Sequence, residues 1–219
     1  TDPMTQREKA QRKISAANAR PHMPTHVPAR LIVGISGASG VVFGVRLLEL
    51  LRETMIETHL VMSRTAELTL AYETDRKLAA VKALADHVHS NDDLAAPISS
   101  GSFLTLGMIV APCTIKTLSA IANSFTYNLV IRAADVTLKE RRPLVLMVRE
   151  TPLHKGHLEL MSRVADYGGI LLPPMPAFYH KPQTVMDIVH QTLGKALDQV
   201  GIEHNLFARW TGEDRGGAG

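Results

Sequence analysis

Small hydroxyl side chains and glycines follow the first apolar segment of this chain. The run Leu31–Ile35 leads into Ser36-Gly37-Ala38-Ser39-Gly40, and helical periodicity begins directly afterwards, at Val41. A glycine-rich backbone can approach a ligand closely, and the N-terminus of the helix that follows attracts phosphate. The glycines at 34, 37 and 40 give the spacing GxxGxxG rather than GxGxxG, so the loop alone is a weak signal of a nucleotide site.

Polar residues also follow the other apolar runs. Ser63 follows the second run, Thr114 and Thr117 follow the third, the pair Arg149-Glu150 follows the fourth, and a proline-rich loop that leads to Tyr179 follows the last. Ligands of open α/β sheets bind beyond the carboxyl ends of the strands, so these residues predict a site for an anionic ligand. Because Ser63 stands where a dinucleotide site needs an acid, a mononucleotide such as FMN is favoured over NAD.

Short apolar strands that alternate with amphipathic helices must position these residues. The pattern predicts an α/β fold, a doubly wound, flavodoxin-like or Rossmann-like parallel sheet with helices on both faces. The expected strands are 31–35, 58–62, 108–111, 144–148 and 169–172, and the expected helices are 41–52, 66–72, 79–87, 117–122, 128–140, 153–167 and 184–201.

Length, charge and cysteine content narrow the class of protein. The 219 residues predict one FMN-binding domain over 30–211, a disordered extension over 1–29 and a flexible tail over 212–219. The net charge is +3, but residues 1–30 hold six basic and two acidic groups, which leaves −1 for residues 31–219, so nucleic-acid binding is disfavoured. No apolar run is long enough to span a membrane. The single Cys113 forms no internal disulfide, which favours a reducing, cytoplasmic compartment.

Six segments together resemble the flavin prenyltransferase family of the UbiX/Pad1 type. They are RLIVGISGASG (30–40), LVMSRTA (60–66), SSGSF (99–103), APCTIKTLSAIA (111–122), IRAADVTLKERRPLVLMVRET (131–151) and PPMPAFYHKPQT (173–184). The resemblance spans about residues 30–211. It implies a homo-oligomer, commonly a dodecamer, that binds FMN between subunits. It also implies transfer of a dimethylallyl group from dimethylallyl monophosphate to N5 and C6 of reduced FMN without a metal, and a product that serves UbiD-type decarboxylases in ubiquinone biosynthesis or aromatic-acid breakdown.

The resemblance also implies roles for individual residues. Glu150, Ser39 and Arg149 would be catalytic, with Glu150 handling protons. The prenyl phosphate would be bound by Lys139, Arg149, Tyr179 and Lys195. The flavin would be held by Gly37, Ala38, Ser39, Ser63, Thr114, Ile115, Lys116, Thr117 and Arg132. Thr114 stands where serine is usual and keeps the hydroxyl, whereas Lys195 stands where arginine is frequent and loses the bidentate fork.

Structural interpretations of the same residues remain open. Arg149-Glu150 can be a surface ion pair, Arg132 can pair with Asp135, and Ser63 can be a strand-end cap. A buried Cys113 without an adjacent histidine is a small hydrophobe rather than a nucleophile. A structural role is favoured for His154 and His157 because no further ligand accompanies them, and Trp210 can lie near the pocket.

Two other functions compete with the prenyltransferase. One is a non-catalytic flavin carrier, and the other is an FMN-dependent decarboxylase or a subunit of one. A carrier has no need of a second anion site, so the set of Lys139, Arg149, Glu150 and Tyr179 separates it from the prenyltransferase.

Overall fold

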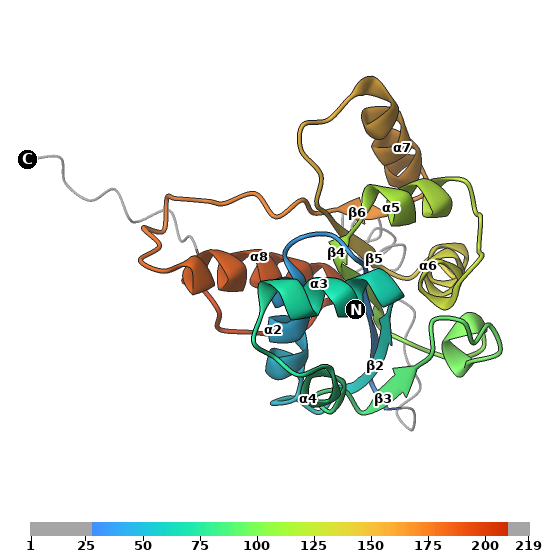
Figure 1. Cartoon of the computed structure of the whole chain (residues 1–219), viewed down its shortest axis with the longest axis horizontal. Helices are drawn as coiled ribbons and strands as arrows, with labels where there is room; N and C mark the ends of the chain where they lie inside the picture. Colours follow the sequence, from blue (N-terminus) through green and yellow to red (C-terminus); the bar gives the residue numbers. More distant parts are fainter. Residues whose placement is uncertain (1–27, 210–219) are drawn as a thin grey trace, which may run out of the picture.

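A six-stranded parallel sheet forms the centre of the molecule (Figure 1). The computed structural model describes residues 28–209. In sequence order the strands are β1 (Arg30–Ile35), β2 (Glu57–Met62), β3 (His87–His89), β4 (Gly107–Cys113), β5 (Leu144–Val148) and β6 (Ile170–Leu171). Their order across the sheet is β3-β2-β1-β4-β5-β6, the Rossmann arrangement, and without the short edge strand β3 it is that of flavodoxin. The predicted fold class is therefore confirmed.

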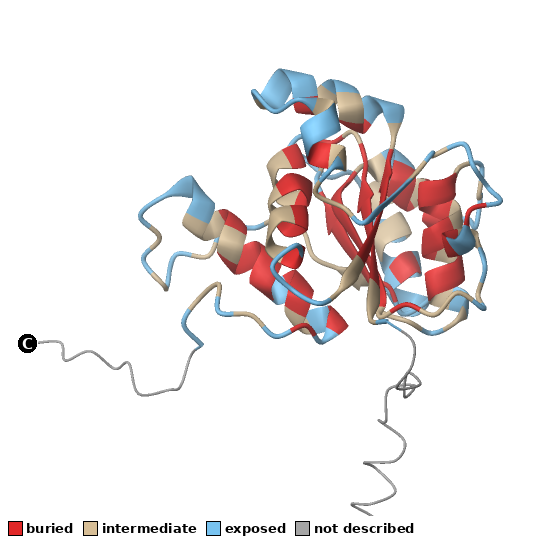
Figure 2. Ribbon diagram, turned by 90° about the horizontal axis from the view of Figure 1, so that it is seen from below, coloured by how far each residue is buried: buried red, intermediate tan, exposed pale blue. Residues whose placement is uncertain are grey.

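Helices cover both faces of the sheet, which buries its strands (Figure 2). One face packs against α2 (Val41–Leu51), α3 (Arg64–Glu73), α4 (Leu78–Lys82) and α8 (Val185–Val200). The other face packs against the 3-10 turn η1 (Pro97–Ser99), α5 (Ile115–Ala122), α6 (Leu129–Lys139) and α7 (Lys155–Asp166). Alternate residues of a strand point to opposite faces, so β1 gives Leu31, Val33 and Ile35 to the first layer and Ile32 to the second.

Two predicted elements were wrong in detail. The segment 79–87 was expected to be helical, but α4 ends at Lys82 and β3 begins at His87. An edge strand of three residues that is largely exposed has neither apolar alternation nor length to reveal it. Pro112 was expected to end the third apolar run, but β4 continues to Cys113 through a register irregularity between Val110 and Cys113. Proline is tolerated in a sheet at such irregularities.

The strand order reverses between β1 and β4, and this point positions the site. On one side of β1 lies β2, to which the chain continues, and on the other side of β1 lies β4. The loops after β1 and β4 therefore diverge and leave a crevice. The predicted extension over 1–29 and tail over 212–219 fall almost entirely outside the described residues, and the domain boundaries remain predictions. Between residues 28 and 209, no helix has the length and apolar character to cross a membrane.

Candidate active site at the carboxyl edge of the sheet

Ser36 joins the two loops at the crevice. Its buried Oγ donates a hydrogen bond to the Pro112 carbonyl (3.0 Å) and accepts one from the Thr114 amide (2.8 Å). The Ser36 amide donates to the same Pro112 carbonyl (3.1 Å). A hydroxyl that bridges two loops in this way fixes their spacing, so the glycine-rich loop and the start of α5 form one rigid platform.

The predicted flavin-binding loop lies against α3. A Cβ atom on Gly37 would come 2.4 Å from the Thr65 side chain, so only glycine permits this approach. Gly40 adopts φ +97° at the N-cap of α2, a conformation that glycine reaches without strain. Between the two glycines Ala38 is buried and Ser39 is exposed at the crevice, available to a ligand.

A second carboxylate, Glu73, enters the site, and the sequence analysis missed it. Its oxygens accept hydrogen bonds from the amides of Gly40 (2.9 Å) and Val41 (3.0 Å) and from the Ser39 side chain. The N-terminus of α2, expected to attract a phosphate, therefore already holds an anion from the chain itself. Burial alone would raise the pKa of Glu73, but these hydrogen bonds and the charge of Arg149 lower it overall.

The spacing of residues on α3 is the signal that could have found Glu73. Thr65, Thr69 and Glu73 recur every four residues and therefore share one face of the helix. All three contact the glycine-rich loop: Thr65 approaches Gly37, Thr69 Oγ1 donates to the Gly37 carbonyl (3.4 Å), and Glu73 binds the start of α2. Helix α3 lies across the carboxyl edge of the sheet (Figure 1).

The predicted hydroxyl residues cap the helices that start at this edge. Ser63 Oγ accepts from the Ala66 amide (3.1 Å), so the capping interpretation is correct for the structure shown. Thr114 Oγ1 accepts from the Thr117 amide (3.0 Å) and donates to Thr117 Oγ1 (2.9 Å). In the same turn Ile115 and Lys116 begin α5, and the Lys116 ammonium lies 5.4 Å from the centre of the Tyr127 ring.

Arg149 and Glu150 follow β5 at the same edge. The Arg149 amide donates to the Cys113 carbonyl (3.0 Å), and Glu150 Oε1 accepts from the Thr151 amide (3.1 Å). Over residues 28–209 the ion pairs do not include one between these two side chains, so the surface-pair interpretation has no support there. The charge of Arg149 instead lowers the pKa of Glu73. We call this whole region the edge site; it consists of residues 36–41, Ser63, Glu73, 114–117, Arg149 and Glu150.

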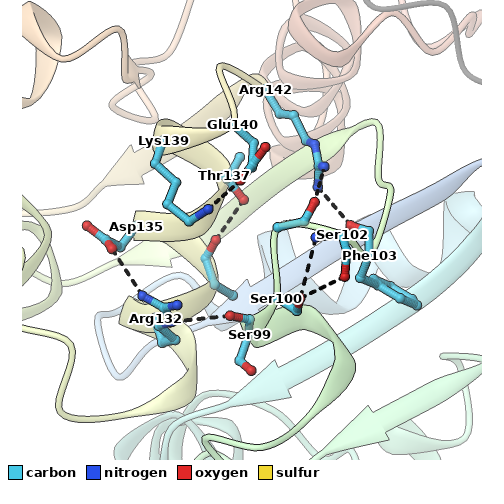
Figure 3. A network of polar contacts seen from close by, with 12 residues as sticks. Ser99, Ser100, Ser102, Phe103, Arg132, Asp135, Thr137, Lys139, Glu140 and Arg142 are labelled. Carbon is cyan, nitrogen blue, oxygen red and sulfur yellow. Dashed lines mark hydrogen bonds and ion pairs between the residues drawn. The ribbon is translucent and has the colours of Figure 1, made fainter.

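Arg132 and Lys139 lie elsewhere, on an outer face of α6 (Figure 3). Arg132 Nε donates to the Ser99 carbonyl (3.2 Å) and Nη1 lies 3.5 Å from Asp135, as the structural interpretation anticipated. Lys139 pairs with Glu140. The strand β5 begins five residues after Lys139, whereas Arg149 follows the end of β5, so Lys139 and Arg149 lie at opposite edges of the sheet. We call Arg132, Lys139 and their partners the α6 face.

Tyr179 lies in the loop before α8, and Lys195 lies on that helix. Gln191 Nε2 donates to the Tyr179 hydroxyl (3.3 Å), and Lys195 is exposed one turn further along the same side of the helix. Since α8 and α6 pack on opposite faces of the sheet, one chain does not gather all the predicted phosphate-binding groups into a single pocket. Their convergence remains a prediction that requires more than one copy of the chain.

The remaining candidates have structural explanations. Cys113 is fully buried, and this burial raises the pKa of its thiol to about 12, so it is not a nucleophile at neutral pH. His154 caps α7 by accepting from the Gly156 amide (3.1 Å), and the His157 ring lies close by, tilted by 34°. Trp210 lies outside the described residues.

The edge site has the donor chemistry that a flavin mononucleotide needs. Hydroxyl groups of Ser39, Ser63 and Thr114 suit a ribityl chain, and the N-terminus of the eight-residue helix α5 suits a phosphate. The α2 N-terminus is satisfied by Glu73, which leaves α5 and α3 as the helix starts for an external anion.

The chain is similar to known flavoproteins over most of its length. The model of the family described as Flavoprotein matches residues 20–196. The flavin prenyltransferase UbiX of Escherichia coli strain K12 is 61% identical over 186 residues, which cover 84% of this chain and 98% of the relative. The UbiX of Thauera aromatica is 58% identical over 185 residues, which cover 84% and 95%.

Solved structures agree with the sequence relatives. The crystal structure of AnUbiX (PadA1) in complex with FMN and dimethylallyl pyrophosphate has a TM-score of 0.82 and 48% identity, covering 84% of this chain and 98% of that one. A dodecameric FMN-dependent UbiX-like decarboxylase from E. coli O157:H7 has a TM-score of 0.81 and 53% identity, covering 83% and 98%. The resemblance inferred from the sequence motifs is confirmed: this chain belongs to the UbiX family of flavin prenyltransferases.

Proposed function

We propose that this chain joins a dimethylallyl group from dimethylallyl monophosphate to reduced FMN. The C–O bond of the donor breaks and inorganic phosphate leaves. New bonds to N5 and C6 of the flavin replace the N5–H and C6–H bonds, and the C=C double bond of the dimethylallyl group takes up one proton as the second bond forms, so that one proton is released overall. The observation that carries the proposal is the edge site, where a hydroxyl-lined nucleotide platform also carries two carboxylates and one guanidinium. The relatives named flavin prenyltransferase UbiX support it.

The flavin would be held at the platform that Ser36 fixes. Reduced FMN supplies the nucleophilic ring positions, and the chain's residues bind and orient it. The proposed contacts are Gly37, Ala38, Ser39, Ser63, Thr114, Ile115, Lys116, Thr117 and Arg132. FMN bound to AnUbiX, which is 48% identical, supports this choice of cofactor.

Cations replace the metal that many prenyl transfers need. A departing phosphate is stabilised by charge-assisted hydrogen bonds, which Lys139, Arg149, Lys195 and the Tyr179 hydroxyl can donate. Because these groups lie in the edge site, on the α6 face and on α8 with the loop before it, we propose that neighbouring copies complete each site in a homo-oligomer, with the dodecamer as the expected form. The UbiX-like protein from E. coli O157:H7 is dodecameric.

The carboxylates of Glu150 and Glu73 would transfer protons. Glu150 would protonate the leaving phosphate or remove the C6 proton during ring closure, a role the released phosphate can share. Ser39 donates to Glu73, so this pair can relay a proton across the start of α2. The lowered pKa keeps Glu73 ionised at neutral pH, which suits it to accept a proton.

Anaerobic incubation with reduced FMN and dimethylallyl monophosphate tests the proposal. We expect mass spectrometry to show a flavin heavier by one prenyl unit. A parallel sample with dimethylallyl pyrophosphate, the molecule bound to AnUbiX, establishes which donor reacts. Bound FMN with both donors intact would contradict the proposal and favour a flavin carrier or a decarboxylase subunit.

The product implies a partner that consumes it. We propose that prenylated FMN passes to a UbiD-type decarboxylase in the cytoplasm, where a single buried thiol stays reduced. Reconstitution of such an apo-decarboxylase by the reaction mixture, and not by FMN alone, is the expected result.

A further inference from the structure

Three imidazoles and one carboxylate gather on β2 and the edge strand β3, outside the edge site. We call Glu57, His59, His87 and His89 the histidine cluster. Glu57 and His59 are alternate residues of β2, and His59 is the direct register partner of His87 on the edge strand β3 (Figure 1). All four side chains therefore point to one face of the sheet. The flavin chemistry uses none of them.

Three ligand atoms of the cluster converge. Glu57 Oε1 lies 2.9 Å from His59 Nε2 and 3.5 Å from His87 Nε2, and all three atoms lie within 4.8 Å of one another. Ligands of a tetrahedral zinc ion, with bonds of about 2.0–2.1 Å, are separated by about 3.3 Å. Two imidazoles and one carboxylate with an open fourth position form a common zinc-binding set. The spacing of this set needs only a small adjustment to hold an ion.

A fourth residue orients the buried ligand. His59 Nδ1 lies 2.9 Å from His89 Nε2, and the planes of the two rings differ by only 7°. Histidines that bind a metal almost always use their second ring nitrogen in such a hydrogen bond, which fixes the tautomer. With an ion on His59 Nε2, Nδ1–H donates to His89 Nε2, and the proton total of the two rings stays unchanged.

Burial affects two of the imidazoles in the cluster. Burial lowers the pKa of His59, with a smaller opposing effect from its hydrogen bond to Glu57 and a further lowering by His87 and His89. Burial also lowers the pKa of His89, as does the neighbouring His87, against the charge of Asp93.

The Glu57 carboxylate already pairs with one cation, Arg30. Arg30 Nε lies 3.0 Å from Glu57 Oε1, and its guanidinium lies 4.5 Å from the centre of the Phe103 ring. An incoming ion would displace Arg30 from this oxygen while the stacking on Phe103 can persist. His87 is more than half exposed and lies on a three-residue strand, so it is free to turn its ring toward the ion.

We propose that Glu57, His59 and His87 bind one divalent ion of the zinc class, with His89 orienting His59. The ion would join β2 to the edge strand β3. Phe103 packs edge-on against His59 (5.0 Å between ring centres), so the ion would also brace the segment that carries Ser99 and Phe103 against the sheet.

Cobalt titration of the full-length, chelator-treated protein tests this site. We expect one Co²⁺ per chain with the intense visible bands of tetrahedral coordination, displaced by Zn²⁺. His87→Ala should abolish these bands, because its exposed side chain is dispensable for folding but supplies a ligand. His89→Ala should weaken binding roughly 10- to 100-fold, as expected for a residue that orients a ligand.

Two control variants use the other histidine pairs of the chain. His154→Ala/His157→Ala removes the pair on α7, and His22→Ala/His26→Ala removes two histidines outside the described residues. Both should retain the one-to-one Co²⁺ spectrum. The proposal is overturned if the wild-type chain binds no stoichiometric Co²⁺, if His87→Ala binds it unchanged, or if either control variant loses it.

Discussion

The edge site and the α6 face carry polar groups of the same kinds but hold them differently. At the edge site, Ser36 bridges two loops, Thr114 caps α5, and the Glu73 carboxylate is fixed by backbone amides. On the α6 face, Lys139 pairs with the adjacent Glu140, and Arg132 holds a carbonyl and a carboxylate one turn away (Figure 3). The first region is organised by the fold itself, whereas the second presents cations that a ligand or another copy of the chain can recruit.

The edge site therefore positions groups, whereas the α6 face supplies positive charge. A group fixed by backbone hydrogen bonds needs no reorganisation when charge develops during a reaction. A lysine in a local ion pair gives up a contact worth only about 0–1 kcal/mol when it turns to a phosphate. We therefore expect substitutions at the edge site to affect catalysis and folding, and substitutions on the α6 face to affect catalysis alone.

Glu150→Gln should produce the largest effect. Loss of a general acid or base costs about 10²- to 10⁴-fold in turnover, while the hydrogen bond from the Thr151 amide can be retained by the amide oxygen. We expect kcat for prenyl transfer to fall by this factor with the Kd for FMN unchanged. Glu159→Gln, on the exposed side of α7, is the matched control. An unchanged rate in Glu150→Gln would remove this residue from the mechanism.

Lys139→Ala should slow the reaction without loss of stability. A hydrogen bond to a charged group contributes about 1.5–3 kcal/mol, so kcat/KM should fall roughly 10- to 100-fold while the melting temperature stays the same. Lys155→Ala, which removes another exposed helical lysine paired with a glutamate, controls for surface charge.

Co-expression of Lys139→Ala with Glu150→Gln then distinguishes a shared site from a single-chain site. If neighbouring copies complete each site, mixed oligomers contain some sites with both native residues, and activity should exceed that of either variant alone. Equal inactivity of the mixture would place both residues in one chain's site.

Gly37→Ala should damage folding and flavin binding together. The added Cβ would lie 2.4 Å from the Thr65 side chain, next to the backbone, where little relaxation is possible. Overpacking of this kind costs about 1–3 kcal/mol. We expect denaturant unfolding to show this loss and FMN titration to show weaker binding. Gly168→Ala, where a Cβ would meet open space, tests the alternative that any loop glycine is equally sensitive, although its φ of +93° adds some strain.

The sequence predicted most of the edge site because its residues directly follow strands. Ser39, Ser63, Thr114 and Arg149 could be placed on one edge from strand ends alone. Glu73 could not, since it ends a helix and reaches the site only because α3 crosses the sheet edge. Local sequence does not encode that crossing, although the four-residue spacing of Thr65, Thr69 and Glu73 is consistent with it.

Whether the predicted phosphate-binding cations converge could not be judged from the sequence either, because it depends on how the helices pack. Spacing along the chain places Lys139 at the end of one helix and Lys195 within another, but which face of the sheet each helix covers depends on packing. The strand β3 escaped prediction because three exposed residues carry no periodicity. The local sequence pattern is therefore insufficient to predict features that depend on helix packing, on the oligomer or on a short edge strand.

Glu73→Gln should give the smallest effect on stability, and this loss should depend on pH. The folded-state pKa of Glu73 is lowered, so its contribution is present above its ordinary pKa near 4.5 and is lost as pH falls through the folded value. A carboxylate at a helix N-terminus contributes about 0.3–1 kcal/mol at an exposed position. Urea unfolding at pH 7 should show Glu73→Gln less stable by about this amount, and the gap should narrow as the pH falls below 4.5. Glu53→Gln, outside any ion pair of residues 28–209, should show no such gap. A gap that persists unchanged at low pH would mean that Glu73 acts through packing rather than charge, and the edge site would then be organised by shape alone.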